Sequence, residues 1–353
     1  MRKLLVMLLC CLLLTCSSAA HAETGVDSRG LTWINQMAYL NGQPYGMTSV
    51  GGWRARTTIY AQTDQGMEVV WTGEGRGRGL FAVGDKLVLI AEKPTDFWEE
   101  LFSMYPPVGE RFVGVIDPTT WEAALMPIPT AGMPRCVLNG ALVRWRCWQE
   151  EGLPHVEICR WGGVDWEETF VWTGETPLEG SSYTSLYPGF LLLDQQLHDG
   201  GVRDLRIITL ADGRDHLLRD VEPRYGNALD AVLDGDMLYL LGDSGLWRFD
   251  LAAGTRELLL PGMTARFIMN GRYIVGYVRG AGLQVWDRET EALLWEVDVP
   301  QDAHYWLLDG DTLYLQDYTK GGYMIDGRMH SQRPYAAVIN LTTGECRITP
   351  FEY

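Results

Sequence analysis

Residues 283–297 read L-Q-V-W-D-R-E-T-E-A-L-L-W-E-V. Leu283, Val285 and Asp287 alternate with Gln284 and Trp286. A turn follows, and the apolar run 292–295 comes directly after it. Alternation with a period of two is typical of a β-strand, so this stretch predicts a strand, a tight turn and a second strand. The same hairpin unit recurs along the chain, and the recurrence decides the fold.

The first recurring signature is an apolar residue followed by Asn-Gly, Asp-Gly or a related pair. Such pairs favour two-residue hairpin turns, because both central positions need a positive φ. We name the four strands of each unit a, b, c and d, and we expect this signature between strands a and b. Its seven copies are residues 40–42, 83–85, 138–140, 187–189, 233–235, 269–271 and 308–310.

The second signature is Asp or Asn, about three further residues, often a Gly, and then an apolar strand. We expect it between strands c and d. Its copies are residues 63–66, 117–121, 209–213, 250–254, 287–291 and 340–344. The unit is then a four-stranded antiparallel meander of roughly 35 to 55 residues.

Four-stranded sheets repeated around an axis form a β-propeller. The sequence therefore predicts an all-β fold, a propeller of seven blades with four antiparallel strands each. Six or eight blades stay open, because the first and fourth units carry weak signatures. The blades run in phase with the chain, so the ring closes without a shared strand, or else residues 23–29 pair with the last blade.

The first 22 residues have the pattern of a secretory signal peptide. Arg2 and Lys3 precede an apolar run, and Ala20-His21-Ala22 fits a cleavage site. Cleavage before Cys16, as in a lipoprotein, is the alternative, although a small residue is missing from the positions before it. We expect residues 23–353 to form a single propeller domain that lies outside the cytoplasm.

The charge of the chain narrows the classes of partner. The 46 acidic residues outnumber the 29 basic ones, which gives a formal net charge of −17. Such a balance favours solubility and disfavours binding to nucleic acid or to anionic membranes. No stretch after the signal region is apolar for about 18 residues, so we expect no membrane span and, most simply, a monomer.

The cysteines leave two alternatives open. Cys147 and Cys159 fall on two strands that the repeat pairs, so an exported chain permits a disulfide there, and buried free thiols are the other option. Their spacing matches no zinc pattern, and we expect no metal site.

The hairpin at residues 283–297 resembles the repeat of the PQQ-like (quinoprotein) propeller superfamily. Asp287, Thr290, Leu294 and Trp295 fall on its positions, and Glu291 replaces the usual Gly. The resemblance implies that Trp295 packs between neighbouring blades. The chain is also similar to secreted bacterial propellers of the DUF5050 and TolB-like kind, which implies a binding or scaffolding role.

No bound quinone follows from the PQQ-like resemblance. Many quinoproteins carry adjacent cysteines at the cofactor, whereas the adjacent pair of this chain, Cys10 and Cys11, lies in the signal region. We expect no cofactor.

We expect function at the b–c and d–a connections, which share one face of the disc and look longer than the turns of the other face. The insertion at residues 92–111 carries Phe97, Trp98, Phe102 and Tyr105, with a short helix expected at 96–104. Aromatic side chains among polar ones fit a contact with a protein or a sugar, or else they pack down as a lid over their own blade.

Two further groups of residues are candidates. Tyr318, Tyr323 and His330 lie in residues 317–334, where glycines indicate a mobile loop or an extra hairpin. Arg76 and Arg78 lie in the run G-E-G-R-G-R-G, which we expect to be a d–a connection. These arginines would either meet an anionic ligand near the central channel or pair with acidic groups of the protein.

Motifs of known catalytic sites are missing. The sequence contains no H-E-x-x-H and no G-x-S-x-G. The first hypothesis is therefore an exported, non-enzymatic propeller that binds a protein or a cell-envelope ligand such as a glycan. The alternative is a secreted glycan hydrolase or lyase with carboxylates at the mouth of the channel, and a third is a purely structural component of a surface assembly.

Overall fold

The structure is a computed structural model. It describes residues 37–50, 54–63, 66–94, 110–128, 136–138, 141–161, 166–175, 182–187, 189–195, 203–221, 230–278, 281–299, 305–317, 321–325, 328–332 and 334–350. These ranges contain thirty strands and no helix. Accordingly, the described residues contain no helix that is long and apolar enough to cross a membrane.

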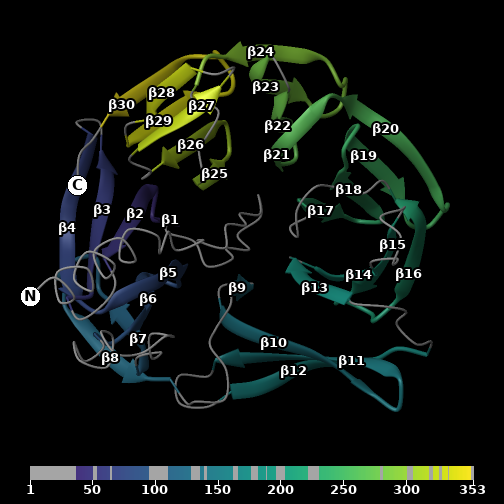
Figure 1. Cartoon of the computed structure of the whole chain (residues 1–353), viewed down its shortest axis with the longest axis horizontal. Helices are drawn as coiled ribbons and strands as arrows, with labels where there is room; N and C mark the ends of the chain where they lie inside the picture. Colours follow the sequence, from purple (N-terminus) through teal and green to yellow (C-terminus); the bar gives the residue numbers. More distant parts are fainter. Residues whose placement is uncertain are drawn as a thin grey trace, which may run out of the picture.

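The strands form seven four-stranded antiparallel sheets arranged in a ring, which confirms the predicted seven-bladed propeller (Figure 1). Each blade is built from consecutive strands of the chain. Those of blades 1 to 3 are β1 Met37–Leu40, β2 Gln43–Val50, β3 Arg56–Thr63, β4 Gly66–Glu74, β5 Arg76–Val83, β6 Lys86–Glu92, β7 Arg111–Ile116, β8 Ala123–Pro127, β9 Cys136–Leu138, β10 Ala141–Glu150, β11 Leu153–Trp161 and β12 Trp166–Thr173.

Blades 4 to 7 follow the same order, and blade 7 has an additional hairpin between its strands b and c. Their strands are β13 Ser182–Tyr187, β14 Phe190–Gln195, β15 Arg203–Thr209, β16 Asp215–Val221, β17 Ala231–Asp234, β18 Met237–Leu241, β19 Gly245–Asp250, β20 Thr255–Pro261, β21 Met263–Met269, β22 Tyr273–Val278, β23 Gly282–Asp287, β24 Leu293–Val297, β25 Tyr305–Asp309, β26 Thr312–Asp317, β29 Tyr335–Asn340 and β30 Cys346–Pro350, and the extra hairpin is β27 Gly321–Ile325 with β28 Arg328–Gln332.

The c–d turns show why their signature begins with Asp or Asn. In blade 6, Oδ1 of Asp287 accepts hydrogen bonds from the backbone N–H groups of Glu289 and Thr290 at 3.1 and 2.8 Å. The first residue of the signature thus fixes its own turn, as Asx residues commonly do. The fifth residue has a positive φ, which suits Gly254 but leaves Glu291 in the left-handed region at 59°.

The core consists of apolar clusters that lie between successive blades. The cluster between blades 6 and 7, for example, joins Val285 of β23 to the fully buried Trp306 of β25. Equivalent clusters join every other pair of neighbours around the ring. Each blade therefore buries its two faces against its neighbours, and this burial is the main favourable term for the fold.

The ring closes between blades 1 and 7, and in the described part of the chain no strand is shared there. The apolar cluster described at this seam contains one fully buried residue, Met37. The other members of the cluster are partly buried. Polar contacts supplement it. The hydroxyl of Tyr39 donates to Oδ2 of Asp309 at 2.6 Å, and the buried amide of Gln316 donates to Oε1 of Gln62 at 2.6 Å.

Trp295 contacts the neighbouring blade at the rim of the ring. Its indole N–H donates to the backbone carbonyl of Leu341 in the c–d turn of blade 7 at 2.8 Å, and its ring lies against Gly344. The side chain is nevertheless 36% exposed. The contact between blades that the PQQ-like resemblance implies is present, but it leaves the ring half-buried.

The cysteines that the structure describes with side chains are free thiols. Cys147 lies opposite Val156 and Cys159 lies opposite Arg144 in the β10–β11 ladder, so the two thiols are out of register. Of the two alternatives left open by the sequence, the structure supports free thiols.

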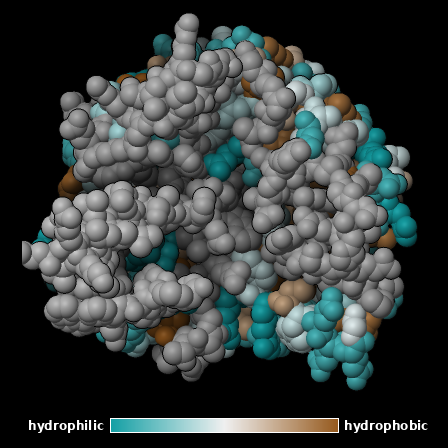
Figure 2. Space-filling model, in the orientation of Figure 1, coloured by the Kyte–Doolittle hydropathy of each residue, from teal (hydrophilic) through white to brown (hydrophobic). Residues whose placement is uncertain are grey.

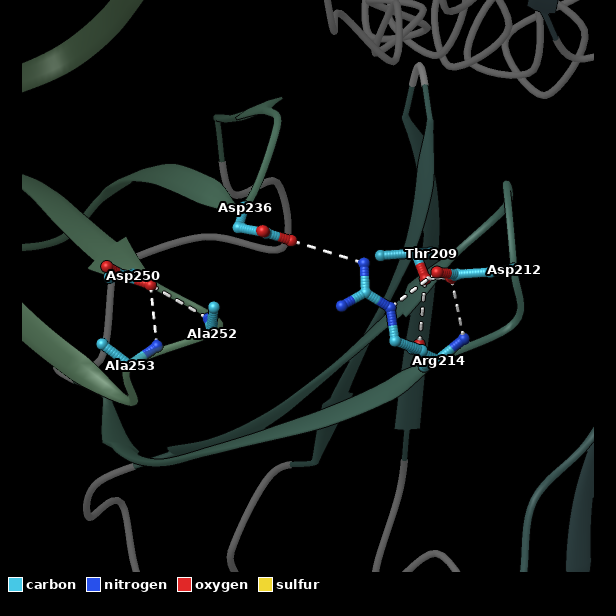
Figure 3. A network of polar contacts seen from close by, with 7 residues as sticks. All are labelled: Thr209, Asp212, Arg214, Asp236, Asp250, Ala252 and Ala253. Carbon is cyan, nitrogen blue, oxygen red and sulfur yellow. Dashed lines mark hydrogen bonds and ion pairs between the residues drawn. The ribbon is translucent and has the colours of Figure 1, made fainter.

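The face that carries the a–b and c–d turns is linked from blade to blade by charged side chains. Figure 3 shows one link, in which Arg214 of blade 4 pairs with Asp212 beside it and reaches Asp236 of blade 5 at 3.3 Å. Another joins Arg248 of blade 5 to Glu291 of blade 6 at 3.1 Å. Charges on this face thus serve the ring itself.

Candidate functional site

The opposite face holds the b–c and d–a connections, and their lengths correct one expectation. The prediction that these connections are longer than the turns of the other face holds for only some of them. Gly75 and Gly262 are one-residue d–a connections, and the b–c turn of blade 3 consists of Glu151 and Gly152 alone. Long connections are confined to certain positions, among them residues 93–110 in blade 2.

Arg76 and Arg78 lie in strand β5 and not in a loop, which corrects the prediction that residues 73–79 form a connection. The strand can begin directly after Gly75 because that residue has a φ of +105° and its N–H donates to the carbonyl of Ala55 at 2.8 Å. The alternative of pairing within the protein holds for Arg78, which binds Glu92.

Glu92 is a buried carboxylate between two arginines. Its side chain is 7% exposed. Nε and Nη2 of Arg78 donate to Oε2 at 2.9 and 2.7 Å, and Nε of Arg111 donates to Oε1 at 3.3 Å. A buried charge is tolerated when it is paired and hydrogen-bonded in this way. The group carries one surplus positive charge and fixes strand β6 to its neighbours β5 and β7.

A pocket of about 510 Å³ opens at the b–c and d–a edge of blades 1 and 2. This volume lies in the range typical of sites for small ligands. The pocket is lined by Arg54, Ala55, Arg56, Thr72, Gly73, Glu74 and Pro94.

The wall between the two blades is held by a buried threonine. The hydroxyl of Thr57 donates to the carbonyl of Gly75 and accepts from the N–H of Gly77, both at 2.7 Å. A Cβ at Gly75 would lie 2.9 Å from the carbonyl oxygen of Glu92, so β4, β5 and β6 approach closely here. The pocket therefore rests on a rigid base.

Charges alternate along this edge. Arg56 lies opposite Glu74 in the β3–β4 ladder. In blade 2, Arg76 lies opposite Glu92, which lies opposite Arg111. The row places guanidinium and carboxylate groups side by side at the entrance to the connections.

The predicted aromatic candidates have different outcomes. Phe97, Trp98, Phe102 and Tyr105, together with the expected helix at 96–104, lie outside the described residues, as does Tyr318. The root of their insertion is described: Lys93 and Glu110 pair at 2.6 Å and continue the β6–β7 ladder by a backbone hydrogen bond.

Tyr323 and His330 lie opposite each other in the β27–β28 hairpin. Of the two alternatives for residues 317–334, the extra hairpin is therefore correct.

Sequence reasoning missed Arg54, Arg56 and Glu74. The sequence contains only a weak indication of them. Two of three successive residues, 54–56, are arginines, and Glu74 ends the sequence V-W-T-G-E, which recurs at residues 171–175. Only the pairing of β3 with β4 shows that these charges meet.

A second polar surface lies on the projecting hairpin of blade 3, where hydrophilic atoms gather at the lower right of Figure 2. The guanidinium of Arg146 lies 4.5 Å from the ring of Trp148, and His155 stacks on that ring at 5.4 Å. Arg146 also donates to Glu157. These side chains thus contact one another.

The described residues contain no cluster of three His, Cys, Asp or Glu side chains that would hold a metal ion. Hydrogen bonds from Lys86 of strand β6 and then from Thr119 lower the pKa of Asp117, and hydrogen bonds within turns lower the pKa of Asp212 and Asp287. Burial raises the pKa of Asp215, which pairs with Arg206 at 3.1 Å at the c–d end of β16. These four carboxyl groups thus lie at the face that carries the a–b and c–d turns, and not at the pocket.

Comparison of the sequence with protein-family models and with curated proteins gives no match. Solved structures that resemble the chain include a puromycin hydrolase, with a TM-score of 0.50, 14% identity and coverage of 95% of this chain and 57% of that one. The acylaminoacyl peptidase of Pyrococcus horikoshii matches with a TM-score of 0.52 and 12% identity, and the match covers 91% of this chain and 52% of that one. The β-propeller domain of the Trilobed protease from Pyrococcus furiosus, which has an open velcro topology, matches with a TM-score of 0.53 and 10% identity, and the match covers 91% of this chain and 98% of that one.

The chain spans about half the length of the first two proteins and nearly all of the third. At such identities the likeness shows the β-propeller fold alone. The matches do not confirm the resemblance to PQQ-like or TolB-like propellers, which stays a prediction.

Proposed function

We propose that the chain is an exported, non-enzymatic β-propeller that acts as a scaffold and binds a protein or cell-envelope ligand at the b–c and d–a edge of blades 1 and 2. The pocket lined by Arg54, Arg56 and Glu74 carries this proposal. Export rests on the signal-like sequence of residues 1–22.

The polar groups of the two faces differ, and this difference supports a binding site at the b–c and d–a edge. On the a–b and c–d face, charged side chains such as Arg214 and Arg248 join one blade to the next. On the other edge, a pocket lies beside the root of the insertion that carries four aromatic residues. Loops on a rigid scaffold are where binding residues concentrate.

The proposal is tested with residues 23–353 on a glycan array and in a pull-down from the native organism. In the test variant, a short Gly-Ser turn replaces residues 95–109 and leaves the Lys93–Glu110 pair intact. In the matched control, a short turn replaces residues 318–333, which removes the hairpin of blade 7 on the same edge. We expect the test variant to lose its ligand at an unchanged melting temperature and the control to keep it.

Two results would contradict the proposal. Ligand retention by the variant without residues 95–109 would place binding elsewhere. A collapse of its melting temperature would show that the insertion is a structural lid over blade 2.

The alternative of a secreted glycan hydrolase or lyase requires carboxylates that converge on a substrate, one of them with a raised pKa. In the described part of the chain, Asp215 is the carboxyl group with a raised pKa, and Arg206 neutralises it at the rim. We therefore rank the binder first. Release of reducing ends from an array-positive glycan by the purified chain would reverse this order.

A second candidate is a propeller that serves a peptidase. It is favoured by the full-length match to the propeller domain of the Trilobed protease. Incubation of the purified chain with chromogenic acyl-peptides tests for activity of its own, and turnover that a serine-directed inhibitor abolishes would contradict the scaffold proposal.

A further inference from the structure

The charged residues that line the pocket at blades 1 and 2 carry a net positive charge in an acidic protein. They are Arg54, Arg56 and Glu74, which gives a local formal charge of +1 in a chain of −17. Charges elsewhere on the surface are screened beyond about 8–10 Å at physiological ionic strength, so the local sign governs what enters the pocket.

The arginines of this region have different roles. Arg78 and Arg111 are engaged with the buried Glu92 and hold the base. Arg54 and Arg56 have exposed side chains that line the pocket. A planar guanidinium binds a carboxylate or a phosphate through two parallel hydrogen bonds, so these two residues select an anionic group.

Glu74 narrows the class of anion. It lines the same pocket and lies opposite Arg56 in the β3–β4 ladder. A fixed carboxylate beside the arginines disfavours a doubly charged phosphate and accepts hydrogen bonds from hydroxyl groups. Thr72 adds a hydroxyl that both donates and accepts. The lining thus fits a group that carries one carboxylate together with several hydroxyls.

We infer that this pocket binds an acidic sugar, that is, a uronate unit of an acidic glycan. Arg54 and Arg56 take the carboxylate, and Glu74 and Thr72 take the ring hydroxyls. This inference rests on the proposed function and names the ligand class of the same site. The pocket volume of about 510 Å³ admits a sugar residue with its neighbours, and the base fixed by Thr57 keeps the donors in place.

Titration calorimetry with four probes tests the inference: trigalacturonate, neutral galactotriose, triglutamate and inorganic phosphate. We expect trigalacturonate to bind and the other three to bind at least about tenfold more weakly, because each lacks either the carboxylate or the hydroxyls. Arg56→Gln should lower the affinity for trigalacturonate by about tenfold or more. Arg272→Gln is the matched control, since Arg272 is an exposed arginine of the other face that pairs with Asp311.

Glu74→Gln provides a second readout on a variant that removes no arginine. It should reduce the ratio of the affinities for trigalacturonate and phosphate, because the Glu74 carboxylate no longer repels phosphate. Circular dichroism checks that each variant folds, and Arg54→Gln replaces Arg56→Gln if that variant does not.

Equal binding of triglutamate would overturn the inference in favour of an acidic peptide, and equal binding of phosphate or galactotriose would overturn it as well. Binding of none of the four probes would do the same. The inference can fail while the proposed function stands: this is the result if the variant without residues 95–109 loses its array ligand while Arg56→Gln keeps it. Retention of the ligand by the variant without residues 95–109 would instead contradict the proposed function.

Discussion

Replacing Trp295 by Ala tests how the blades are held together at the rim. The indole ring lies against Gly344 of the next blade and donates to the carbonyl of Leu341 at 2.8 Å. Leu293 on the same strand is 47% exposed against 36% for Trp295. Leu293→Ala is therefore the matched control for loss of apolar surface without loss of the contact between blades.

The expected cost follows from the buried area. A Trp side chain buries about 150–250 Å² when fully enclosed. With 36% of it exposed, about two-thirds of that area leaves water, which is worth about 2.5–4 kcal/mol at about 25 cal/mol per Å². Residual burial in the unfolded chain reduces this figure by about 10–40%. Trp295→Ala should thus destabilise by about 2–3 kcal/mol, and Leu293→Ala by about 1 kcal/mol or less.

Urea denaturation followed by far-ultraviolet circular dichroism measures the stability of both variants. The free energies of unfolding are compared from the urea midpoints, with one m-value used for all variants. A double-mutant cycle with Gly344→Ala adds a second criterion. A Cβ at Gly344 would lie 2.8 Å from the indole, so Gly344→Ala should cost less once the indole is removed. Equal effects of Trp295→Ala and Leu293→Ala, or an unchanged cost of Gly344→Ala in the two backgrounds, would refute the reasoning.

Three further predictions concern single sites. Gln62→Leu removes one acceptor of the buried Gln316 amide and should lower the free energy of unfolding by about 1–3 kcal/mol. The double variant with Leu at positions 62 and 316 should recover most of this loss, and equal thermal stability of the single variant and the wild type would contradict the prediction. The hydroxyl of Thr209 lowers the pKa of Asp212 to about 2, so this carboxylate adds stability above its unfolded pKa of about 4 that is lost as the pH falls towards 2. Asp212→Asn should flatten that limb of the acid denaturation curve, and an unchanged curve would argue against it. Gly245→Ala places a Cβ 2.2 Å from the backbone carbonyl oxygen of Leu260 in strand β20 and should lower the melting temperature markedly. An unchanged melting temperature would contradict this prediction.

The turns could be predicted from the sequence because their interactions are local. Asp287 binds N–H groups two and three residues away, and Gly42 supplies a positive φ within its own turn. Such information lies inside five-residue windows, so it is readable without the fold. Seven repetitions of these windows then fixed the architecture.

The pocket could not be predicted, because it depends on contacts between residues far apart in the chain. Arg56 and Glu74 meet through strand pairing, and Arg76 belongs to a strand because Thr57 of the previous blade holds the residues before and after it. A run of Gly and Arg resembles a loop when it is read alone. Trp295 illustrates the same limit, since its partial exposure reflects its place on the outermost strand.

The absence of a shared strand at the described seam has a consequence for how the chain folds. Each blade completes its described sheet from one continuous part of the chain, so the contacts within a blade can form before the ring closes. The seam is the exception, because Tyr39 and Asp309 are 270 positions apart. Closing so long a loop costs more entropy than joining neighbouring blades, and few apolar contacts among the described residues offset this cost. Blade 1 and blade 7 should therefore associate last and separate first, with amide hydrogens of β1 and β25 exchanging before those of β21 and β22; the reverse order would show that the seam is held as firmly as the other interfaces.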